Sequence, residues 1–504
     1  MSTPKVQKKT RTKPDSGKVR DKSVLPPRED RLGSIIVAGG TAKNLVDQTR
    51  RKCLKNQDRS FSQTTFCQQW LAIFTLATIK DTVVIVHGPV GCISSLPYIN
   101  VFNRLGQIHR NGKPVSGRWI STNLLEADTI YGGEEKLRTA IRSADERYHP
   151  GAIFIFTSCV SGIMGEDIDA VIESVQPEIK ATAIPIHCDG FRSKLWASGY
   201  DGSFHGVLNY LIKGPVEKKA DLVNVINPLT IGRPDEVEIE RLLKKLNLRA
   251  NFIPCFASID AIKESASAAL TTGLCPTYGE YLAKILGERY RIVATQKVMP
   301  IGLDNTDLWL REVARPLGKE KEVEKLIKDE RRRVKPQIDA LRKKLAGKKV
   351  FVSAGQSRAV GIPNMVADIG LEIVGVTAFH YDEVTYDSFA DLTKRCGNFP
   401  TSVANLQPFE QTNLLHQQKP DIFIGHSGET VWAAKQGFPT VMGLNLFHLF
   451  VGYDGVVTFG NRLVDAFTNP AFNKNLSAHS KNVYHDDWYT ANPFKYIREA
   501  ACHR

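Results

Sequence analysis

The sequence predicts an α/β fold of doubly wound parallel sheets, on three observations. From about residue 34, apolar strand-like runs alternate with amphipathic helical stretches, which is the pattern of βαβ units. Residues 82–86 and 152–156 are continuous apolar, β-branched runs that end abruptly in Gly, Pro, Ser or Thr, as buried parallel strands do. A chain of 504 residues is long enough for about three domains of ordinary size. We therefore expect three doubly wound, Rossmann-like domains with parallel sheets.

The first two expected domains cover residues 34–215 and 216–345. The candidate strands of the first domain are residues 82–86, 152–156 and 182–186. A helix is expected to begin near residues 165–167, because acidic side chains suit the positive end of a helix dipole. The second domain opens with a strand from about residue 221. It ends in a highly charged helix over residues 320–345, which we interpret as a solvated connector between domains.

The third expected domain covers residues 346–504. Its candidate strands begin at Lys349, Leu371 and Asp421. Ligands bind at the carboxyl ends of parallel strands, so the loops that follow these strands are candidate binding loops. One of them carries Arg358, a candidate for hydrogen bonds to an anion or to cluster sulfides, with a surface ion pair as the alternative. Another carries His426 directly after a strand.

The first 33 residues form a basic tail. They hold ten Lys or Arg and four Asp or Glu, and so contribute +6 of the net charge of +14. The other +8 is spread over the rest of the chain, a distribution that does not favour a nucleic-acid partner. The tail is poor in aromatic residues and rich in Lys, Pro, Ser and Asp, so we expect it to be disordered or draped over a partner.

Other bulk features indicate a cytoplasmic protein without a membrane partner. No apolar run approaches the roughly 20 residues that cross a bilayer, and no apolar segment near the N-terminus resembles a secretory signal. Nine cysteines, an odd number, are scattered from Cys53 to Cys502. This usage fits metal ligation in a reducing compartment better than a disulfide framework.

Three cysteines are the strongest candidates for metal ligation. Cys67, Cys92 and Cys159 each lie just after a strand-like run or in an apolar turn. Cysteine thiolates are the usual ligands of iron–sulfur clusters. The set therefore predicts a cluster gathered from distant parts of the chain. The alternative for each cysteine alone is an ordinary buried thiol that behaves as a small hydrophobic residue.

Two further residues are candidates for a second site. Cys275 precedes a proline, which biases it away from helical geometry and lets its sulfur face a cavity. His448 lies among aromatic and aliphatic residues, where a core histidine is the alternative to a metal ligand. Cys188 and Cys255 are interpreted as structural thiols.

Taken in order, these segments resemble the α subunit of nitrogenase component 1 and its nitrogenase-like relatives, from about residue 40 to residue 475. The segment His87-Gly-Pro-Val-Gly-Cys92 resembles the cluster loop of that family, and Cys67 lies upstream at nearly the family's spacing. Cys159, followed closely by Gly-Ile-Met-Gly-Glu-Asp-Ile, resembles the third cysteine loop. Two more segments resemble family motifs: residues 129–137 and 187–192.

The resemblance implies two metal groups and two protein partners. Cys67, Cys92 and Cys159 would hold an [8Fe-7S] P-cluster shared with a homologous β-like subunit in an α2β2 heterotetramer. Cys275 would be the single cysteine ligand of a large nitrogenase-type iron–sulfur cofactor. Electrons would come from an ATP-dependent [4Fe-4S] iron protein, and this chain itself has no Gly-x-x-x-x-Gly-Lys-Ser/Thr loop for ATP.

The second ligand of that cofactor is open in the sequence. The motif Gly452-Tyr-Asp-Gly455 is present, but Val451 stands where nitrogenase carries a histidine. His448 lies three residues earlier and is our candidate, with His426 as the reserve. Arg358 would also contact the cofactor.

The pocket residues depart from nitrogenase. After residues 188–192 the chain reads Ser-Lys-Leu-Trp-Ala-Ser-Gly-Tyr, without the Gln and His that nitrogenase places beside its cofactor. The segment after Gly425 also lacks an evident counterpart of the lysine near the organic acid of the molybdenum cofactor. We therefore expect an iron-only cofactor. Neighbours that would shape the pocket or deliver protons, each with plain packing as the alternative, are His187, Arg192, Trp196 and His380.

Among family members with such a changed pocket, the chain most resembles the catalytic subunit of methylthio-alkane reductase. That resemblance implies ATP-dependent reductive cleavage of the C–S bond of small methylthio-alkanes to methanethiol and a hydrocarbon. Two alternatives remain: an alternative nitrogenase that reduces dinitrogen, and a non-catalytic scaffold for cofactor assembly. The pairing of Cys275 with a histidine candidate argues against the scaffold.

Overall fold

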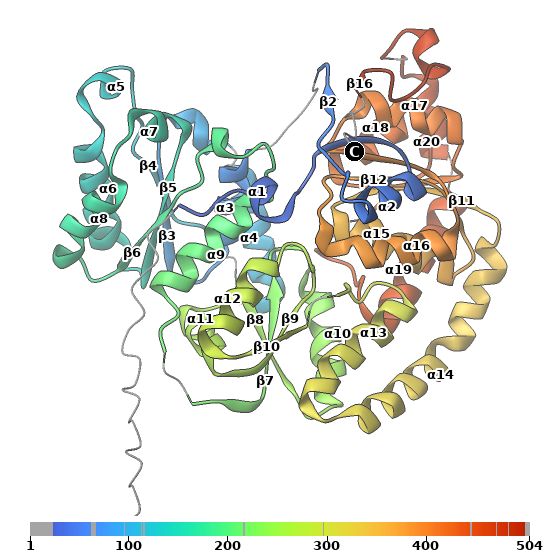
Figure 1. Cartoon of the computed structure of the whole chain (residues 1–504), viewed down its shortest axis with the longest axis horizontal. Helices are drawn as coiled ribbons and strands as arrows, with labels where there is room; N and C mark the ends of the chain where they lie inside the picture. Colours follow the sequence, from blue (N-terminus) through green and yellow to red (C-terminus); the bar gives the residue numbers. More distant parts are fainter. Residues whose placement is uncertain are drawn as a thin grey trace, which may run out of the picture.

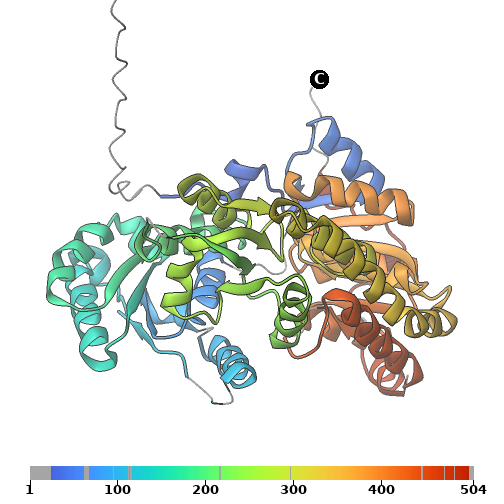
Figure 2. The same cartoon turned by 90° about the horizontal axis from the view of Figure 1, so that it is seen from below.

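The computed structural model describes residues 24–498 apart from residues 62–66, 95, 112, 114–115, 215–216, 296, 444–445, 470 and 482. Three sheets, two wholly parallel and one parallel except for its edge strand, each with its own helices, form three lobes that meet near the middle of the molecule (Figure 1). Seen from below, the lobe of the second sheet lies between the other two (Figure 2). The predicted α/β class with parallel sheets is confirmed.

The first sheet is parallel throughout, in the order β4-β3-β5-β6. Its strands are β3 (Thr82–His87), β4 (Trp119–Ser121), β5 (Ala152–Thr157) and β6 (Thr182–Ile186). Its helices are α3 (Gln68–Leu76), α4 (Leu96–Asn111), α5 (Asp128–Tyr131), α6 (Glu134–Tyr148), α7 (Cys159–Met164), α8 (Ile168–Val175) and α9 (Ser198–Tyr210). Val83 and Ile153 belong to an apolar cluster with α6 and α8, whereas Val84 and Phe154 cluster with α3 and α9. Both faces are buried, which is why the strands read as continuous apolar runs.

The second sheet is also parallel, in the order β10-β9-β7-β8. Its strands are β7 (Lys219–Asn227), β8 (Arg249–Pro254), β9 (Ala268–Gly273) and β10 (Val293–Thr295). The helices that follow along the chain are α10 (Arg233–Lys244), α11 (Ile259–Glu264), α12 (Glu280–Tyr290), α13 (Leu303–Ala314) and α14 (Glu320–Leu345). The connector interpretation of α14 needs correction. A stripe that includes Val323, Ile327 and Val334 is buried in the core shared with the third sheet, so only the opposite face is solvated.

The third sheet has the order β1-β13-β12-β11-β14-β15. Its strands are β1 (Val37–Thr41), β11 (Lys349–Ala354), β12 (Glu372–Ala378), β13 (Pro400–Ala404), β14 (Ile422–Gly425) and β15 (Thr440–Met442). Its helices are α2 (Ala42–Arg50), α15 (Gln356–Asp368), α16 (Tyr386–Cys396), α17 (Pro408–Gln418), α18 (Ser427–Lys435), α19 (Gly452–Thr468) and α20 (Ala471–Ala478). β1 pairs antiparallel with β13, so the chain from residue 37 begins in the third sheet and not in the expected first domain. A small two-stranded sheet pairs β2 (Asp58–Arg59) with β16 (Ile497–Arg498).

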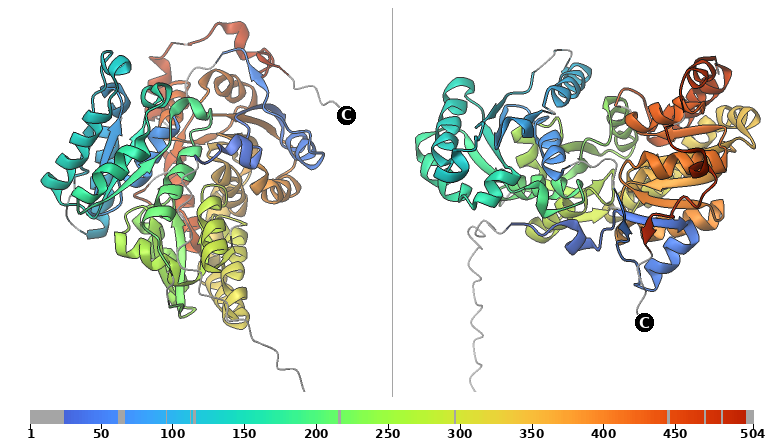
Figure 3. Two further views of the ribbon diagram at one scale, coloured as in Figure 1. Left: turned by 60° about the vertical axis from the view of Figure 1, so that its left-hand side comes forward. Right: turned by 90° about the horizontal axis from the view of Figure 1, so that it is seen from above.

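The expected basic tail of residues 1–33 folds in the part that the structure describes. Residues 1–23 lie outside the described residues. Residues 28–32 form the helix α1 (Arg28–Leu32), drawn in dark blue near the junction of the lobes (Figure 3). Arg28 is fully buried, so this end of the tail packs against the chain itself.

Near the cysteine loops one expected helix is confirmed, and two features of the structure were not expected. The helix expected near residues 165–167 is present as α8, and the Asp167 side chain accepts a hydrogen bond of 2.9 Å from the Ala170 N–H. The short helix α7, which begins at Cys159 itself, was not expected. Cys53 is disulfide-bonded, which the cysteine pattern did not indicate either.

Among the described residues, no helix combines the length and apolar composition that crossing a bilayer requires.

Candidate functional site

A cavity of about 630 Å³ is lined by residues from all three lobes. The ends of four strands of the third sheet reach it, with Ala354 at the end of β11, Phe379 after β12, His426 after β14 and Gly443 after β15. The loop after β9 of the second sheet adds Cys275. The cavity therefore lies at the carboxyl edge of parallel strands, where open α/β sheets hold ligands.

The cavity wall is largely apolar, and aromatic side chains are its largest group. Its rings are those of Trp70, Phe74, Tyr98, Phe102, Trp196, Tyr200, Tyr278, Phe379 and Phe447. Trp70 stacks on Trp196 with ring centroids 6.2 Å apart and an interplanar angle of 21°. Tyr200 packs on Tyr278 at a centroid distance of 4.6 Å. Such a wall excludes water and binds apolar groups.

A smaller set of polar groups faces the same cavity. The Cys275 sulfur lies 3.2 Å from the Ser357 hydroxyl oxygen, and both residues are buried. Burial raises the pKa of the Cys275 thiol. A metal ion that binds the sulfur would displace the proton and hold it as thiolate.

His426 provides an imidazole to the cavity. Its Nδ1 lies 3.2 Å from the Ser427 hydroxyl, and its ring packs edge-on against Phe379 at 5.9 Å. Burial, reinforced by the nearby Arg358 charge, lowers the pKa of His426 to about 4. The ring is therefore neutral at physiological pH, which is the form that ligates metals.

Arg358 is a buried cation on the cavity wall. Its Nη1 donates to the Gly443 carbonyl at 3.1 Å, and its Nη2 donates to the Thr230 carbonyl. Burial lowers the pKa of Arg358, and the Asp235 carboxylate opposes that effect. Both hydrogen bonds go to neutral carbonyls, and the nearby Asp235 carboxylate stabilises the positive charge. An anionic occupant of the cavity would add to that stabilisation.

The structure does not bring every candidate to this cavity. Trp196 lines it, but His448 is exposed and does not. His187 pairs with Asp169 at 2.7 Å, away from the cavity lining. Because His448 is exposed while His426 lines the wall, the structure favours His426, the reserve candidate, as the imidazole of the site.

Two other candidates form local contacts outside the cavity lining. Arg192 pairs with Asp189, three residues earlier, and its side chain is partly exposed. His380 is fully buried and stacks on Tyr278 at a centroid distance of 5.4 Å. Burial lowers the pKa of His380 to about 3, so the ring is neutral. Neither residue contacts the cavity directly.

The three candidate cluster cysteines of the first lobe, Cys67, Cys92 and Cys159, lie on neighbouring loops. A Cβ atom added to Gly190 would lie 2.9 Å from the Cys67 sulfur and 3.1 Å from the Cys159 sulfur, so both sulfurs lie close to one point. A Cβ added to Gly88 would lie 3.7 Å from the Cys92 sulfur. A side chain at Gly190 would therefore occupy the space beside two of these sulfurs.

This cysteine site is open to solvent. Cys67 is exposed, and Cys92 and Cys159 are partly exposed. Exposed apolar side chains flank the loops, including Val90 at 60% and Ile163 at 77% exposure. Among the residues that the structure describes, no three His, Cys, Asp or Glu side chains are arranged to hold a single metal ion. By contrast, Cys188 and Cys255 are buried as expected of structural thiols, with sulfurs 3.7 and 3.6 Å from backbone carbonyls.

The aromatic wall was largely missed by sequence reasoning. Trp70 and Phe74 follow Cys67 on α3 at a spacing of four, and Tyr98 and Phe102 follow Cys92 on α4 at the same spacing. That spacing places each pair on one helix face. The signal was therefore present, but a core-facing stripe would look the same.

Comparison with known proteins gives a consistent set of similarities. A family profile described as "Nitrogenase component 1 type Oxidoreductase" matches residues 67–468. The nitrogenase iron-molybdenum cofactor biosynthesis protein NifE of Methanococcus maripaludis is 28% identical over 432 residues, which cover 84% of this chain and 87% of that protein. The nitrogenase molybdenum-iron protein alpha chain of Methanothermobacter thermautotrophicus is 28% identical over 413 residues, which cover 78% and 85%. The solved structure of "Nitrogenase Cp1 at pH 5" matches with a TM-score of 0.68 at 24% identity, over 82% of this chain and 91% of that one, a likeness of fold.

Proposed function

Because the chain belongs to the nitrogenase component 1 type oxidoreductases, we propose that it is the catalytic α-like subunit of a reductase that cleaves the C–S bond of small methylthio-alkanes. The observation that supports this most is the cavity, where Cys275, His426 and Arg358 face a largely apolar chamber rich in aromatic rings. A soft thiolate and a neutral imidazole suit an iron–sulfur group. The aromatic wall suits an apolar thioether.

The residues of the cavity fit a large iron–sulfur cofactor, and each would have a different role in binding it. Cys275 and His426 would hold it, and Arg358 would balance the negative charge of its sulfides. When bound, the cofactor would supply low-potential electrons and iron sites for thioether sulfur. The rings of Trp196 and Tyr200 would keep water out and orient the alkyl groups of the substrate. For dimethyl sulfide the overall reaction consumes two electrons and two protons, breaks one C–S bond, and yields methanethiol and methane.

The cysteine site supports a shared cluster. Two thiols beside Gly190 and a third beside Gly88, all at least partly open to solvent, would form an incomplete ligand set, and their flanking apolar side chains favour coverage by another protein. We propose that a homologous β-like subunit completes an [8Fe-7S] P-cluster there. An ATP-dependent iron protein would feed electrons into this cluster.

The proposed reaction is tested with the complex of both subunits, the iron protein, ATP and a low-potential reductant. We expect 2-methylthioethanol, with two electrons and two protons, to give methanethiol, ethylene and water, since its C–O bond breaks as well, and dimethyl sulfide to give methanethiol and methane. Little or no ammonia should form from dinitrogen. Metal analysis of the anaerobic complex should show abundant iron without stoichiometric molybdenum or vanadium. Robust ammonia formation without thioether cleavage would instead establish the nitrogenase alternative.

A second candidate function is a scaffold for cofactor assembly. It is favoured by the similarity to the cofactor biosynthesis protein NifE along 84% of this chain. A scaffold would transfer its cluster to a second apoprotein and would not turn over thioethers. Transfer of the cluster to an added apoprotein, together with no thioether turnover in the assay above, would decide for the scaffold.

The choice of imidazole gives a separate prediction. His426→Ala should lose most of the cavity-bound iron, because it removes the imidazole on the wall, whereas His448→Ala should retain iron close to the wild-type content, because His448 is exposed. Iron analysis of both anaerobically purified variants checks this. The reverse pattern would restore His448 as the ligand.

A further inference from the structure

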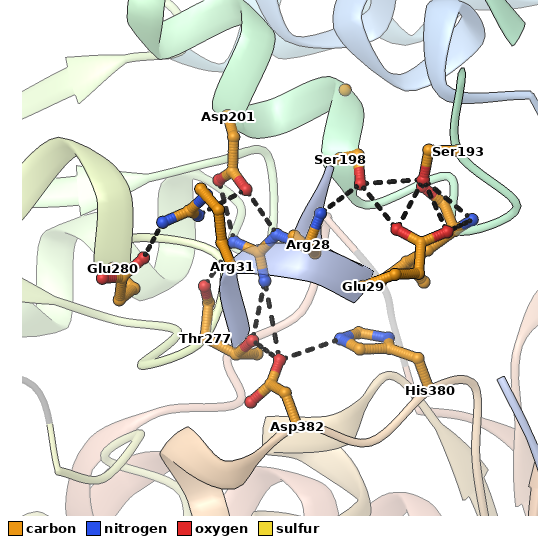
Figure 4. A network of polar contacts seen from close by, with 12 residues as sticks. Arg28, Glu29, Arg31, Ser193, Ser198, Asp201, Thr277, Glu280, His380 and Asp382 are labelled. Carbon is orange, nitrogen blue, oxygen red and sulfur yellow. Dashed lines mark hydrogen bonds and ion pairs between the residues drawn. The ribbon is translucent and has the colours of Figure 1, made fainter. Parts of the chain in front are cut away.

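The helix α1 joins the three lobes through one buried guanidinium (Figure 4). Arg28 donates to the Asp201 carboxylate of α9 at 2.9 Å and forms an ion pair with it at 2.8 Å. It also donates to the hydroxyl and the carbonyl oxygens of Thr277, at 2.8 and 2.5 Å, in the loop between β9 and α12. Asp382, beyond β12, lies 3.7 Å away. Each lobe therefore supplies one partner of Arg28.

The loop that Arg28 contacts is the loop that carries Cys275. Thr277 lies two residues after Cys275 and directly before Tyr278, and both of these neighbours line the cavity. The Thr277 hydroxyl also donates to Asp382. The loop is therefore held from α1 on one side and from the third lobe on the other.

The contacts of Asp382 lead back to the neighbourhood of Cys275. The Gln356 side chain donates to the Asp382 carbonyl at 2.8 Å and accepts from its N–H at 3.1 Å. Gln356 precedes Ser357, whose hydroxyl lies 3.2 Å from the Cys275 sulfur. Arg28 is thus connected to the surroundings of the Cys275 sulfur through Thr277, Asp382 and Gln356, which precedes Ser357.

The neighbouring residue of α1 holds a second wall of the cavity. The Glu29 carboxylate accepts from the N–H groups of Lys194 and Leu195, at 2.8 and 3.1 Å. It also accepts from the Ser193 hydroxyl at 2.8 Å. This loop leads into Trp196, which lines the cavity. α1 therefore contacts two of the loops that shape the chamber.

We propose that Arg28 is a positioning residue for the cavity, which fixes the loop of Cys275 by tying Thr277 to α9 and to the segment after β12. The identity of the group that Cys275 would bind rests on the proposed function. The contacts of Arg28 do not depend on it.

An arginine is required at this position because of its shape as well as its charge. Its planar fork reaches a carboxylate on one side and two oxygens of Thr277 on another, and a single ammonium cannot serve both directions. Its full burial beside two carboxylates also stabilises these contacts, because without Arg28 the buried Asp201 would keep only Arg31 as an ion-pair partner and the buried Asp382 would lose its arginine.

The test measures how well the Cys275 thiol is protected in the full-length chain, before any cofactor is loaded. Wild type, Arg28→Lys, Arg28→Gln and Thr277→Val are treated with iodoacetamide, and alkylation of each cysteine is followed by mass spectrometry. Cys188 and Cys255 serve as internal references, because they are as buried as Cys275. Arg31→Gln is the matched control, since Arg31 lies on the same helix and pairs with Asp201 and Glu280 but not with the cysteine loop.

We expect alkylation of Cys275 to become at least tenfold faster in both Arg28 variants and in Thr277→Val, with Cys188, Cys255 and the Arg31→Gln protein within twofold of wild type. Arg28→Lys keeps the charge, so a role in stability alone would be rescued by it. Wild-type protection of Cys275 in Arg28→Lys, or a parallel rise at all three cysteines, would overturn the proposal. If Arg28→Gln does not fold, the alkylation rates of Arg28→Lys and Thr277→Val decide the question.

Failure of the wild-type complex to bind iron in the cavity would refute the proposed function and would leave the alkylation result standing.

Discussion

Replacing Cys275 by alanine is expected to remove the large cofactor while leaving the cluster of the first lobe in place. Cys275 would provide the thiolate ligand on the cavity wall, and loss of a direct ligand should exceed the roughly 10–100-fold loss of metal affinity that follows removal of an outer partner. The two sites use different loops, so they should respond separately. Iron analysis and electron paramagnetic resonance of the reduced complex measure both groups, and thioether turnover should fall below detection.

Two variants separate ligation from packing at this position. Cys255→Ala removes a thiol that is equally buried but bonds a backbone carbonyl, and it should keep both metal groups. Ser357→Ala removes only the hydroxyl beside the Cys275 sulfur and should give an intermediate loss. Full cofactor content in Cys275→Ala would make this residue a structural thiol.

Replacing Cys92 by alanine should abolish the shared cluster and weaken the association of the two subunits. Metal binding is coupled to folding and assembly when the ligands come from different chains. The thiols of Cys67, Cys92 and Cys159 are all at least partly exposed, so the proposed cluster would depend on a partner for completion. Iron content and sedimentation velocity check the two effects.

The control for this prediction is Cys396→Ala on α16 of the third lobe, which removes a partly exposed cysteine remote from the cluster loops. It should retain iron and the complex. An intact heterotetramer with full iron content in Cys92→Ala would rule out a cluster shared through this residue.

The sheets could be predicted from local pattern because both of their faces are buried. Strands such as β3 and β5 then consist almost entirely of apolar residues, and their ends are marked by Gly, Pro and Ser. β1 is different. It is a short Val-Ala-Gly-Gly-Thr segment whose partner β13 lies more than 350 residues later, and no local pattern specifies such a pairing.

The tail illustrates a second limit. Arg28 and Arg31 contribute to a basic composition that is typical of disorder, yet both form ion pairs with Asp201 inside the fold. The desolvation of Arg28 is compensated only by residues that come together in three dimensions. Its burial could therefore not be inferred from composition.

The position of Cys275 on the cavity wall could be predicted from the sequence, but the position of the histidine could not. Cys275 follows a strand and reaches the cavity. His448 was chosen from its distance to the Gly452 motif, but the N–H groups of Phe450 and Val451 bind Asp235, at 2.6 and 3.1 Å, and His448 itself lies on the exposed side of this turn. A separation of three residues does not determine which way a loop side chain points.

The most direct test of the account is anomalous X-ray scattering at the iron edge from crystals of the anaerobically purified complex. The account predicts strong iron peaks inside the cavity, within bonding distance of the Cys275 sulfur and of His426, and a second group of peaks beside Cys67, Cys92 and Cys159. Iron at the three cysteines alone, with a cavity that contains no iron in the complex as purified, would contradict it.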